Sequence, residues 1–279
     1  MERRSRSFYF LAAFFGLFLL FLYGPTLTIA LLSFQGPSGG LTFPMQGVSV
    51  YWFHDLFEQQ AVGDIWGSFR RSLILGLMVM VTTIVVSIMG GLAFRKRFLG
   101  SSFLFYLVIT SLVIPSILIS LGVGLIFNQA GLNVHWSTSG FGSQLTWTLP
   151  FGLLIMFAVF NRFDKSYEEA ARDQGATAWQ TIQYVVLPII SPSLIGVALF
   201  GFTLSYDEFA RTLLTAGSYN TLPLEIFGMT TNVTTPVIYA LGTLTTAFSF
   251  LIIGSFLLAF WIAARRRRRF GSDAGKGMV

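Results

Sequence analysis

The side chains of this 279-residue chain that could do chemistry gather in two polar stretches, residues 167–188 and 204–236. The first reads YEEAARDQGATAWQTIQYVVLP, with three carboxylates and an arginine among small residues. The second contains the adjacent carboxylates Asp207 and Glu208, with Arg211 shortly after them. Charges spaced in this way suit ion pairing and hydrogen bonding, either with a partner protein or with a charged solute.

Catalytic and metal sites find little support in the sequence. There are no cysteines, which excludes disulfides, thiolate nucleophiles and cysteine-based zinc sites. The two histidines, His54 and His135, have no metal-binding partner at ligand spacing, so we predict no metal site. No glycine-rich phosphate-binding loop of the G-x-x-x-x-G-K-S/T type is present. We therefore predict a non-catalytic protein.

Composition indicates the elements that must position these side chains. The chain is 54% apolar and 16% aromatic but only 11% charged, which is typical of a polytopic membrane protein. Because lipid admits only helices or closed barrels, and long uncharged runs do not fit a barrel strand, we predict an all-α fold. The prediction is one transmembrane domain, 1–279, with six spans at about 8–34, 72–94, 98–127, 145–160, 189–206 and 236–264.

Details of the spans lead to further expectations. Pro115 predicts a kink within the third span. The fourth span, 145–160, is shorter than the roughly 20 residues that a membrane helix needs. No span contains Asp, Glu, Lys, Arg or His, which argues against a proton-coupled carrier, because such carriers need ionisable groups at membrane depth.

The distribution of positive charge predicts the orientation. With both termini in the cytoplasm, fifteen of the eighteen Lys and Arg residues lie on the inner side. The outer loops then keep only Arg70, Arg71 and Arg211. The positive-inside rule thus places residues 161–188 in the cytoplasm. The run 265–269 is expected to anchor the last span at anionic lipid rather than to bind nucleic acid.

The cytoplasmic segment 161–188 is expected to form two short helices around a break. Residues 168–174 mostly have good or tolerable helix propensity, and Gly175 stands where a left-handed C-cap would end the first helix. The second helix is expected to stop at Leu187 and Pro188. Glu169-Ala170-Ala171, Gly175, Val185 and Leu187-Pro188 have a spacing that resembles the EAA loop of permease subunits in binding-protein-dependent ABC importers.

This resemblance implies a mechanism and a set of partners. In the family the loop is a coupling helix that docks on a separate ATPase, which binds ATP and Mg²⁺, so no cofactor is expected in this chain. It further implies two ATPase copies, a second and different permease, an extracytoplasmic solute-binding protein and a bacterial inner (plasma) membrane location. The coupling residues carried over by matching positions or proximity to the motif are Glu168, Glu169, Ala170, Ala171, Asp173, Gly175, Leu187 and Pro188.

The second stretch is similar to the second permease of spermidine/putrescine-type importers. The resemblance rests on the runs Ser-Tyr-Asp-Glu-Phe (205–209), Leu-Pro-Leu-Glu (222–225) and Thr-Thr-Pro (234–236). It implies that Tyr206, Asp207 and Glu208 lie on the substrate path, where carboxylates suit a polyamine or related cation. Alternatively, Asp207 or Glu208 pairs with Arg211. Residues expected to contact the solute-binding protein are Tyr219, Asn220 and Glu225.

Three classes of function stay open at this point. The first is an ABC-importer permease, in which the solute is a polyamine or another small compound such as an opine or amino compound, a phosphonate, thiamine or an iron chelate. The second is a carrier that works without an ATPase. The third is a membrane enzyme. The absence of ionisable residues in the spans disfavours the second class, and the absence of a catalytic constellation disfavours the third.

Overall fold

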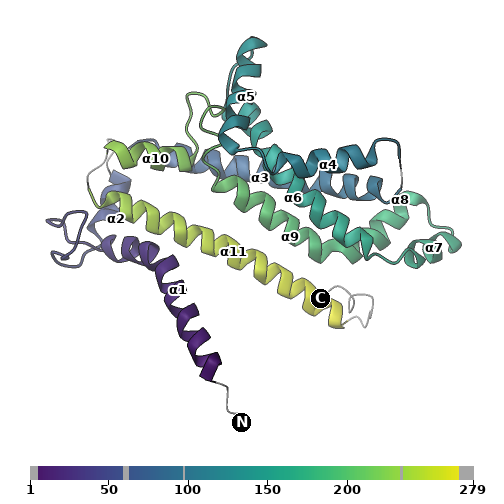
Figure 1. Cartoon of the computed structure of the whole chain (residues 1–279), viewed down its shortest axis with the longest axis horizontal. Helices are drawn as coiled ribbons and strands as arrows, with labels where there is room; N and C mark the ends of the chain where they lie inside the picture. Colours follow the sequence, from purple (N-terminus) through teal and green to yellow (C-terminus); the bar gives the residue numbers. More distant parts are fainter. Residues whose placement is uncertain (1–5, 59–62, 97, 233–234, 270–279) are drawn as a thin grey trace. The chain divides into compact units, whose positions relative to one another are not determined.

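The computed structural model describes residues 6–58, 63–96, 98–232 and 235–269, and the regular elements in these residues are all helices (Figure 1). The all-α prediction is therefore confirmed. Two of the elements, η2 and η3, are single π-helical turns. In chain order the elements are α1 Arg6–Leu32, α2 Tyr51–Glu58, α3 Ile65–Phe94, α4 Ser101–Ser111, α5 Ser116–Gln129, η2 Trp136–Gly140, α6 Phe141–Asn161, α7 Ser166–Asp173, α8 Ala178–Thr181, η3 Ile182–Val186, α9 Leu187–Tyr206, α10 Leu222–Asn232 and α11 Val237–Arg269.

Several of these helices are long and apolar enough to cross a membrane. Within the described residues there are five such helical stretches, or six if α4 and α5 together count as one broken span. The five stretches are Ser7–Leu32, Ile65–Phe94, Trp136–Asn161, Ala178–Tyr206 and Val237–Ile262. A polytopic helical membrane protein is thus confirmed.

The third expected span, 98–127, differs from a simple kinked helix. It divides into α4 and α5, whose axes are bent by 109° at the break. Pro115 is the N-cap of α5, with an extended ψ of 131°. Proline disfavours the helical conformation in the residue before it, so α4 ends at Ser111 instead of continuing. The sequence predicted a kink at Pro115, and the structure has a sharp break there whose angle no residue pattern indicated.

The fourth span is longer than the expected range 145–160. The continuous helical stretch begins with η2 at Trp136 and ends with α6 at Asn161. Its first residues include serines and threonines, which a search for apolar runs leaves out. Two of them are buried: Ser139 donates to the carbonyl of Thr215 at 2.8 Å, and Ser143 donates to the carbonyl of Arg211 at 2.9 Å.

Helices α3, α6 and α9 pack on one another and form the core of one compact unit, residues 65–225 and 251–279. Gly201 allows α9 to approach α3 closely, because a Cβ at this position would lie 3.2 Å from the Cα of Met80. Thr83 and Thr148 join α3 to α6 by a buried hydrogen bond of 2.9 Å. The hydrophobic centre of the unit consists of Met156, Val159, Phe160, Phe163, Val186, Ile190 and Val197.

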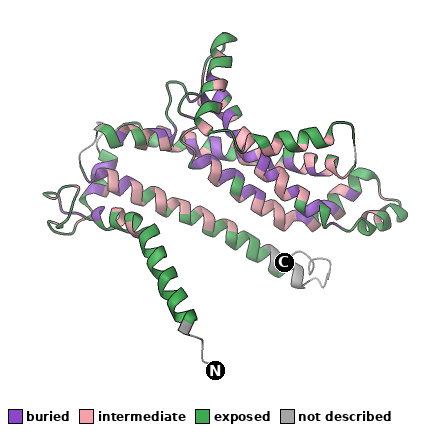
Figure 2. Cartoon of the chain, in the orientation of Figure 1, coloured by how far each residue is buried: buried purple, intermediate pink, exposed green. Residues whose placement is uncertain are grey.

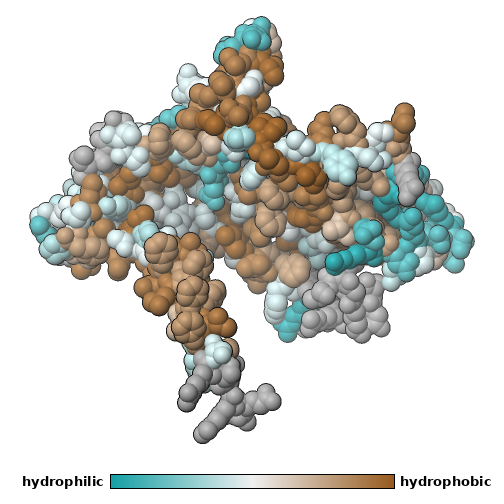
Figure 3. Space-filling view, viewed as in Figure 1, coloured by the Kyte–Doolittle hydropathy of each residue, from teal (hydrophilic) through white to brown (hydrophobic). Residues whose placement is uncertain are grey.

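The other compact unit comprises residues 1–64 and 226–250. Gln35 organises its loop: the buried amide oxygen accepts from the backbone N–H of Gln46 at 2.7 Å. Tyr239 donates to the carbonyl of Leu41 at 2.8 Å and ties α11 to the same loop. Helix α1 is exposed over nearly all of its length, and its surface is apolar (Figures 2 and 3). Such a surface is suited to lipid.

Candidate functional site

The segment between α6 and α9 folds as the expected pair of short helices. Asp164 accepts a hydrogen bond from the backbone N–H of Ser166 at 2.9 Å and so satisfies a donor at the start of α7. Hydrogen bonds from Ser166 hold the pKa of Asp164 below its usual range. Gly175 ends the helix with a left-handed φ of 82°, and Ala176 bonds back to the carbonyl of Ala171 at 3.1 Å. The predicted break at Gly175 is therefore confirmed.

The second helix has its own start signal. Thr177 and Gln180 form a capping box: each side chain accepts a hydrogen bond from the other residue's backbone N–H. The expectation that Leu187 and Pro188 stop this helix is wrong, because helical structure continues from Ala178 to Tyr206. The π-helical turn η3 ends at Val186, two residues before Pro188, which lacks an N–H and would clash with the preceding turn of a regular helix.

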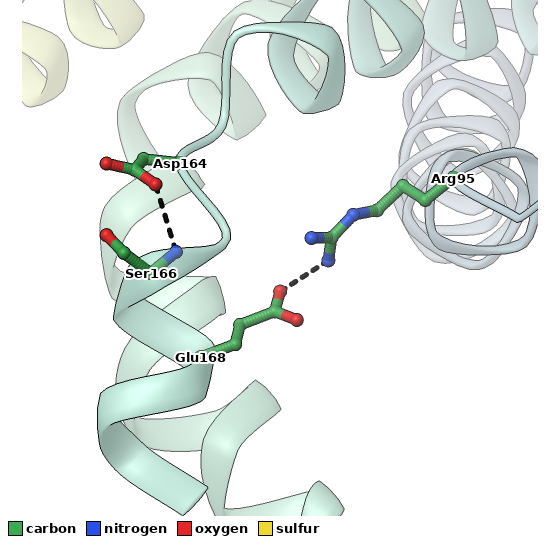
Figure 4. A network of polar contacts seen from close by, with 4 residues as sticks. All are labelled: Arg95, Asp164, Ser166 and Glu168. Carbon is green, nitrogen blue, oxygen red and sulfur yellow. Dashed lines mark hydrogen bonds and ion pairs between the residues drawn. The ribbon is translucent and has the colours of Figure 1, made fainter.

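One ion pair fastens this segment to the membrane helices. Arg95, just beyond the end of α3, reaches the carboxylate of Glu168 in the first turn of α7 (Figure 4). Both side chains are largely buried, at 13% and 14% exposure. The guanidinium also lies over the rings of Phe160 and Phe163, 5.4 Å and 5.2 Å from their centroids. These contacts join α7 to the end of α3 and to the end of α6.

This ion pair was missed in the sequence, where Arg95 served only to predict orientation. The available signal was a cation at the end of an apolar run, with an acidic helix in the next cytoplasmic segment. Seventy-three positions separate the two residues, so no local pattern joins them. Glu168 therefore contacts Arg95 of its own chain, whereas the neighbouring Glu169 is exposed to solvent.

The outward surface of the segment is polar with exposed aromatic rings. We call it the coupling surface and define it by the exposed residues Tyr167, Glu169, Ala170, Asp173, Trp179 and Tyr184. Trp179 and Tyr184 are 68% and 69% exposed, and sequence reasoning did not single them out. The end of the bundle that carries α7 and α8 is visibly hydrophilic (Figure 3). Of the other expected coupling residues, Gly175 and Pro188 are exposed, and Ala171 and Leu187 are half-buried.

A charged cleft lies behind the coupling surface. It has a volume of about 370 Å³ between the end of α3 and helices α7 and α8. Its ionisable lining comprises Arg95, Lys96, Lys165, Glu168, Glu169 and Arg172. Cations and carboxylates face the same space, which suits polar contacts with another protein better than binding of a single anion.

The residues expected on the substrate path, Tyr206, Asp207 and Glu208, lie at the opposite end of α6 and α9. Tyr206 is the last residue of α9, and it is buried with its ring stacked on Phe202. Asp207 follows α9, and part of the residue is exposed to solvent. The surrounding protein nevertheless desolvates its carboxyl group and so raises the pKa of that group. Glu208 accepts a hydrogen bond from the backbone N–H of Arg211 at 3.0 Å.

Arg211 is the most unusual residue of this end. Its side chain is fully buried, and one terminal nitrogen donates to the hydroxyl of Thr146 at 2.6 Å. The guanidinium lies over the ring of Trp147, 5.0 Å from its centroid. Desolvation lowers the pKa of Arg211 and the charge of Glu208 opposes this effect, but arginine stays protonated in proteins. Within the described residues neither Asp207 nor Glu208 forms an ion pair with it, so the pairing alternative is not realised.

The three residues expected to contact a solute-binding protein lie together near the start of α3. The side-chain amide of Asn220 donates to the carboxylate of Glu225 at 2.8 Å. The backbone carbonyl of Asn220 accepts from Nε of Arg71 at 2.7 Å. The guanidinium of Arg71 also lies 5.7 Å from the ring centroid of Tyr219, which is 55% exposed. Contacts from His135 to the same ring complete a polar and aromatic patch.

Comparison with known proteins agrees with this geometry. A family model described as "Binding-protein-dependent transport system inner membrane component" matches residues 83–271. The chain is 26% identical over 235 residues to the spermidine/putrescine transport system permease protein PotC of Haemophilus influenzae. That alignment covers 84% of this chain and 89% of the relative.

Solved structures show the same fold. The chain is similar to one from a bacterial ABC transporter involved in the import of the acidic polysaccharide alginate, with a TM-score of 0.65 and 17% identity. The match covers 98% of this chain and 100% of that one. A second structure, of a bacterial alginate transporter in complex with a pentasaccharide-bound periplasmic protein, has a TM-score of 0.63 at 17% identity and 94% coverage of both chains.

Proposed function

Because this chain belongs to the family of binding-protein-dependent transport system inner membrane components, we propose that it forms half of the translocation path of an ATP-driven importer for a small organic cation. Membership confirms the resemblance based on the spacing in residues 161–188, and it makes the chain a permease subunit of an ABC importer. We further propose the class of solute, the partner subunits and the orientation in the membrane.

The observation that carries the proposal is the coupling surface together with the Arg95–Glu168 ion pair. The surface offers exposed carboxylates and aromatic rings to a partner, while the ion pair passes movement of α7 to α3. We propose that two copies of a cytoplasmic ATPase bind ATP and Mg²⁺ and draw this segment and its counterpart in a second, different permease together. Both termini then lie in the cytoplasm of a bacterial cell, by the positive-inside rule.

The proposal for the solute rests on residues at the end of α9 that lies away from the coupling surface. Asp207 provides an exposed carboxylate beyond the last turn of α9, where attraction would concentrate an organic cation. The relative from Haemophilus influenzae carries the name of a spermidine/putrescine permease, which supports a solute with at least one amino group. An extracytoplasmic solute-binding protein is proposed to deliver it to the patch of Tyr219, Asn220 and Glu225.

The test is assembly and turnover of the complex with its ATPase. Glu169→Ala removes an exposed carboxylate of the coupling surface without touching the Arg95–Glu168 pair. We expect normal membrane abundance of this variant but weaker copurification of the ATPase, or lower solute-stimulated ATP hydrolysis. Glu58→Ala, in α2 of the other compact unit, is the control and should behave as wild type. Full assembly and turnover of Glu169→Ala would contradict the coupling role.

A further inference from the structure

Arg211 is a buried cation that forms no ion pair in the described part of the chain, although the carboxylate of Glu208 accepts from its backbone N–H at 3.0 Å. Thr146 accepts from one terminal nitrogen, but Nε and the other terminal nitrogen are buried without a hydrogen-bond partner there. The amide nitrogen of Gln144, in the same turn of α6, is likewise a buried donor without a partner. Buried charges in proteins are normally paired, because an uncompensated one costs several kcal/mol.

The guanidinium is not needed to hold its own loop in place. The backbone carbonyl of Arg211 accepts from Ser143 at 2.9 Å and from Thr215 at 2.5 Å. Further along, the hydroxyl of Ser120 accepts from the backbone N–H of Leu214 at 2.9 Å, and Ser72 does the same for Leu222 at 2.8 Å. The loop is thus fastened by its backbone, so a neutral side chain could occupy position 211 without loss of these contacts.

The free donors define the chemistry of a partner. Nε and a terminal nitrogen of a guanidinium form a planar fork that matches the two oxygens of a carboxylate. Trp147 supports the plane of the guanidinium from one side, which keeps the fork oriented. Gln144, two residues before Thr146 in α6, has a buried amide nitrogen without a described partner, and its orientation is fixed because its oxygen accepts from the hydroxyl of Ser205.

We propose that Arg211, with Gln144, binds the carboxylate of the transported solute. This inference rests on the proposed function and narrows it: the solute is an amphoteric amino compound, with an ammonium group and a carboxylate, rather than a simple polyamine. Asp207 attracts the ammonium group at the outer end of α9, and Arg211 lies four residues further along the chain. The buried position of Arg211 implies that the solute reaches it only when the outer end opens.

Three matched pairs of compounds test this assignment: cadaverine and lysine, putrescine and ornithine, agmatine and arginine. Each pair differs only by the carboxylate. The assembled importer is reconstituted in vesicles with its ATPase, partner permease and binding protein, and uptake of each compound is measured. We expect wild type to favour the carboxylated member of at least one pair, and Arg211→Gln to lower uptake of that member about tenfold or more while sparing its diamine.

A second pair of variants keeps the test decisive if Arg211→Gln fails to fold. Thr146→Asp places a carboxylate where the hydroxyl now accepts from Arg211, and Thr146→Asn has the same shape without the charge. If Arg211 lacks a counter-charge, the Asp variant has the higher Tm in the assembled complex and loses the preference for carboxylated compounds. Equal Tm values for the two variants would show that a carboxylate, for example from the partner permease, already pairs with Arg211, and would overturn the inference.

The remaining outcomes separate this inference from the proposed function. Uptake that favours the diamine in every pair, and is unchanged by Arg211→Gln, refutes the carboxylate site but leaves the importer for cations intact. An equal loss for both members of a pair in Arg211→Gln indicates a structural role and also refutes the site. If the complex hydrolyses ATP but takes up none of the six compounds, the amphoteric class is wrong. If no ATPase assembles with the chain, the proposed function itself fails.

Discussion

The two ends of the α3–α6–α9 bundle differ in how their charged side chains are paired and buried. At the coupling end, Arg95 is paired with Glu168, and the other charged side chains of α7 are exposed. At the opposite end, Arg211 is fully buried, Nε and one terminal nitrogen of its guanidinium have no acceptor among the described residues, and the pKa of Asp207 is raised by desolvation. The first arrangement is complete within the chain and leaves a polar surface exposed. The second leaves buried donors of Arg211 without a partner in the described residues, and we propose that a charged group completes it.

The largest effect is expected from Gly175→Val at the coupling end. A β-branched residue at a φ of 82° is strained by about 1 kcal/mol or more, and this strain would displace α8 relative to α7. Solute-stimulated ATP hydrolysis should fall to near the basal rate while the chain still inserts in the membrane. Gly100→Val is the matched control, since Gly100 has a φ of 87° but lies at the start of α4. Equal ATPase rates in the two variants would contradict the role of the break.

An intermediate effect is expected from breaking the Arg95–Glu168 pair. Either Arg95→Gln or Glu168→Gln leaves a largely buried charge unpaired, which should lower stability by about 1–3 kcal/mol, between the values for surface and buried pairs. The ratio of transport to ATP hydrolysis should fall as well, because α7 is no longer fastened to α3. A double-mutant cycle over the two substitutions measures how strongly the two side chains stabilise each other and how far the ratio of transport to ATP hydrolysis depends on both. If the effects of the two substitutions are simply additive for both quantities, the pair has no role in coupling.

The smallest effect on stability is expected from Asp207→Asn at the outer end. Since burial raises the pKa of Asp207, the ionised carboxylate costs stability, and this cost is present at pH values above the raised pKa. The variant should therefore be as stable as wild type or slightly more stable at pH 7. Uptake of a cationic solute should nevertheless fall, and in wild type it should fall as acidification passes through the raised pKa. A wild-type profile that Asp207→Asn leaves unchanged would show that another group titrates.

Local patterns predicted the two short helices of residues 161–188 and the break between them. The spacing of Glu169, Ala170, Ala171 and Gly175 identified the segment, and glycine's tolerance of positive φ located the break between α7 and α8. The apolar runs 8–34, 98–127 and 236–264 lie within a few residues of described helical stretches, whereas those that begin at 72, 145 and 189 start seven to eleven residues too late. Where serines and threonines begin a helix, as at Ser139 and Ser143, apolar runs underestimated its length, because these hydroxyls are satisfied by carbonyls of a distant loop.

Contacts between distant parts of the chain were beyond sequence reasoning. The Arg95–Glu168 pair joins positions 73 residues apart, and the contact of Arg211 with Thr146 joins positions 65 apart. The continuation of α8 into α9 through η3 was missed because Pro188 alone predicts a helix stop. The sequence placed Arg211 next to two carboxylates, and only the fold shows that it turns to α6 instead.

The most direct test of the account uses the absence of cysteine in the sequence. Single cysteines replace Tyr184 on the coupling surface and Tyr219 on the patch near the start of α3, both of which are exposed. Cross-linking in membranes that contain the whole transporter should join Tyr184→Cys to the ATPase and Tyr219→Cys to the solute-binding protein. If Tyr184→Cys instead reaches the solute-binding protein, or is labelled by a membrane-impermeant thiol reagent from outside the cell, the coupling assignment and the proposed orientation are both contradicted.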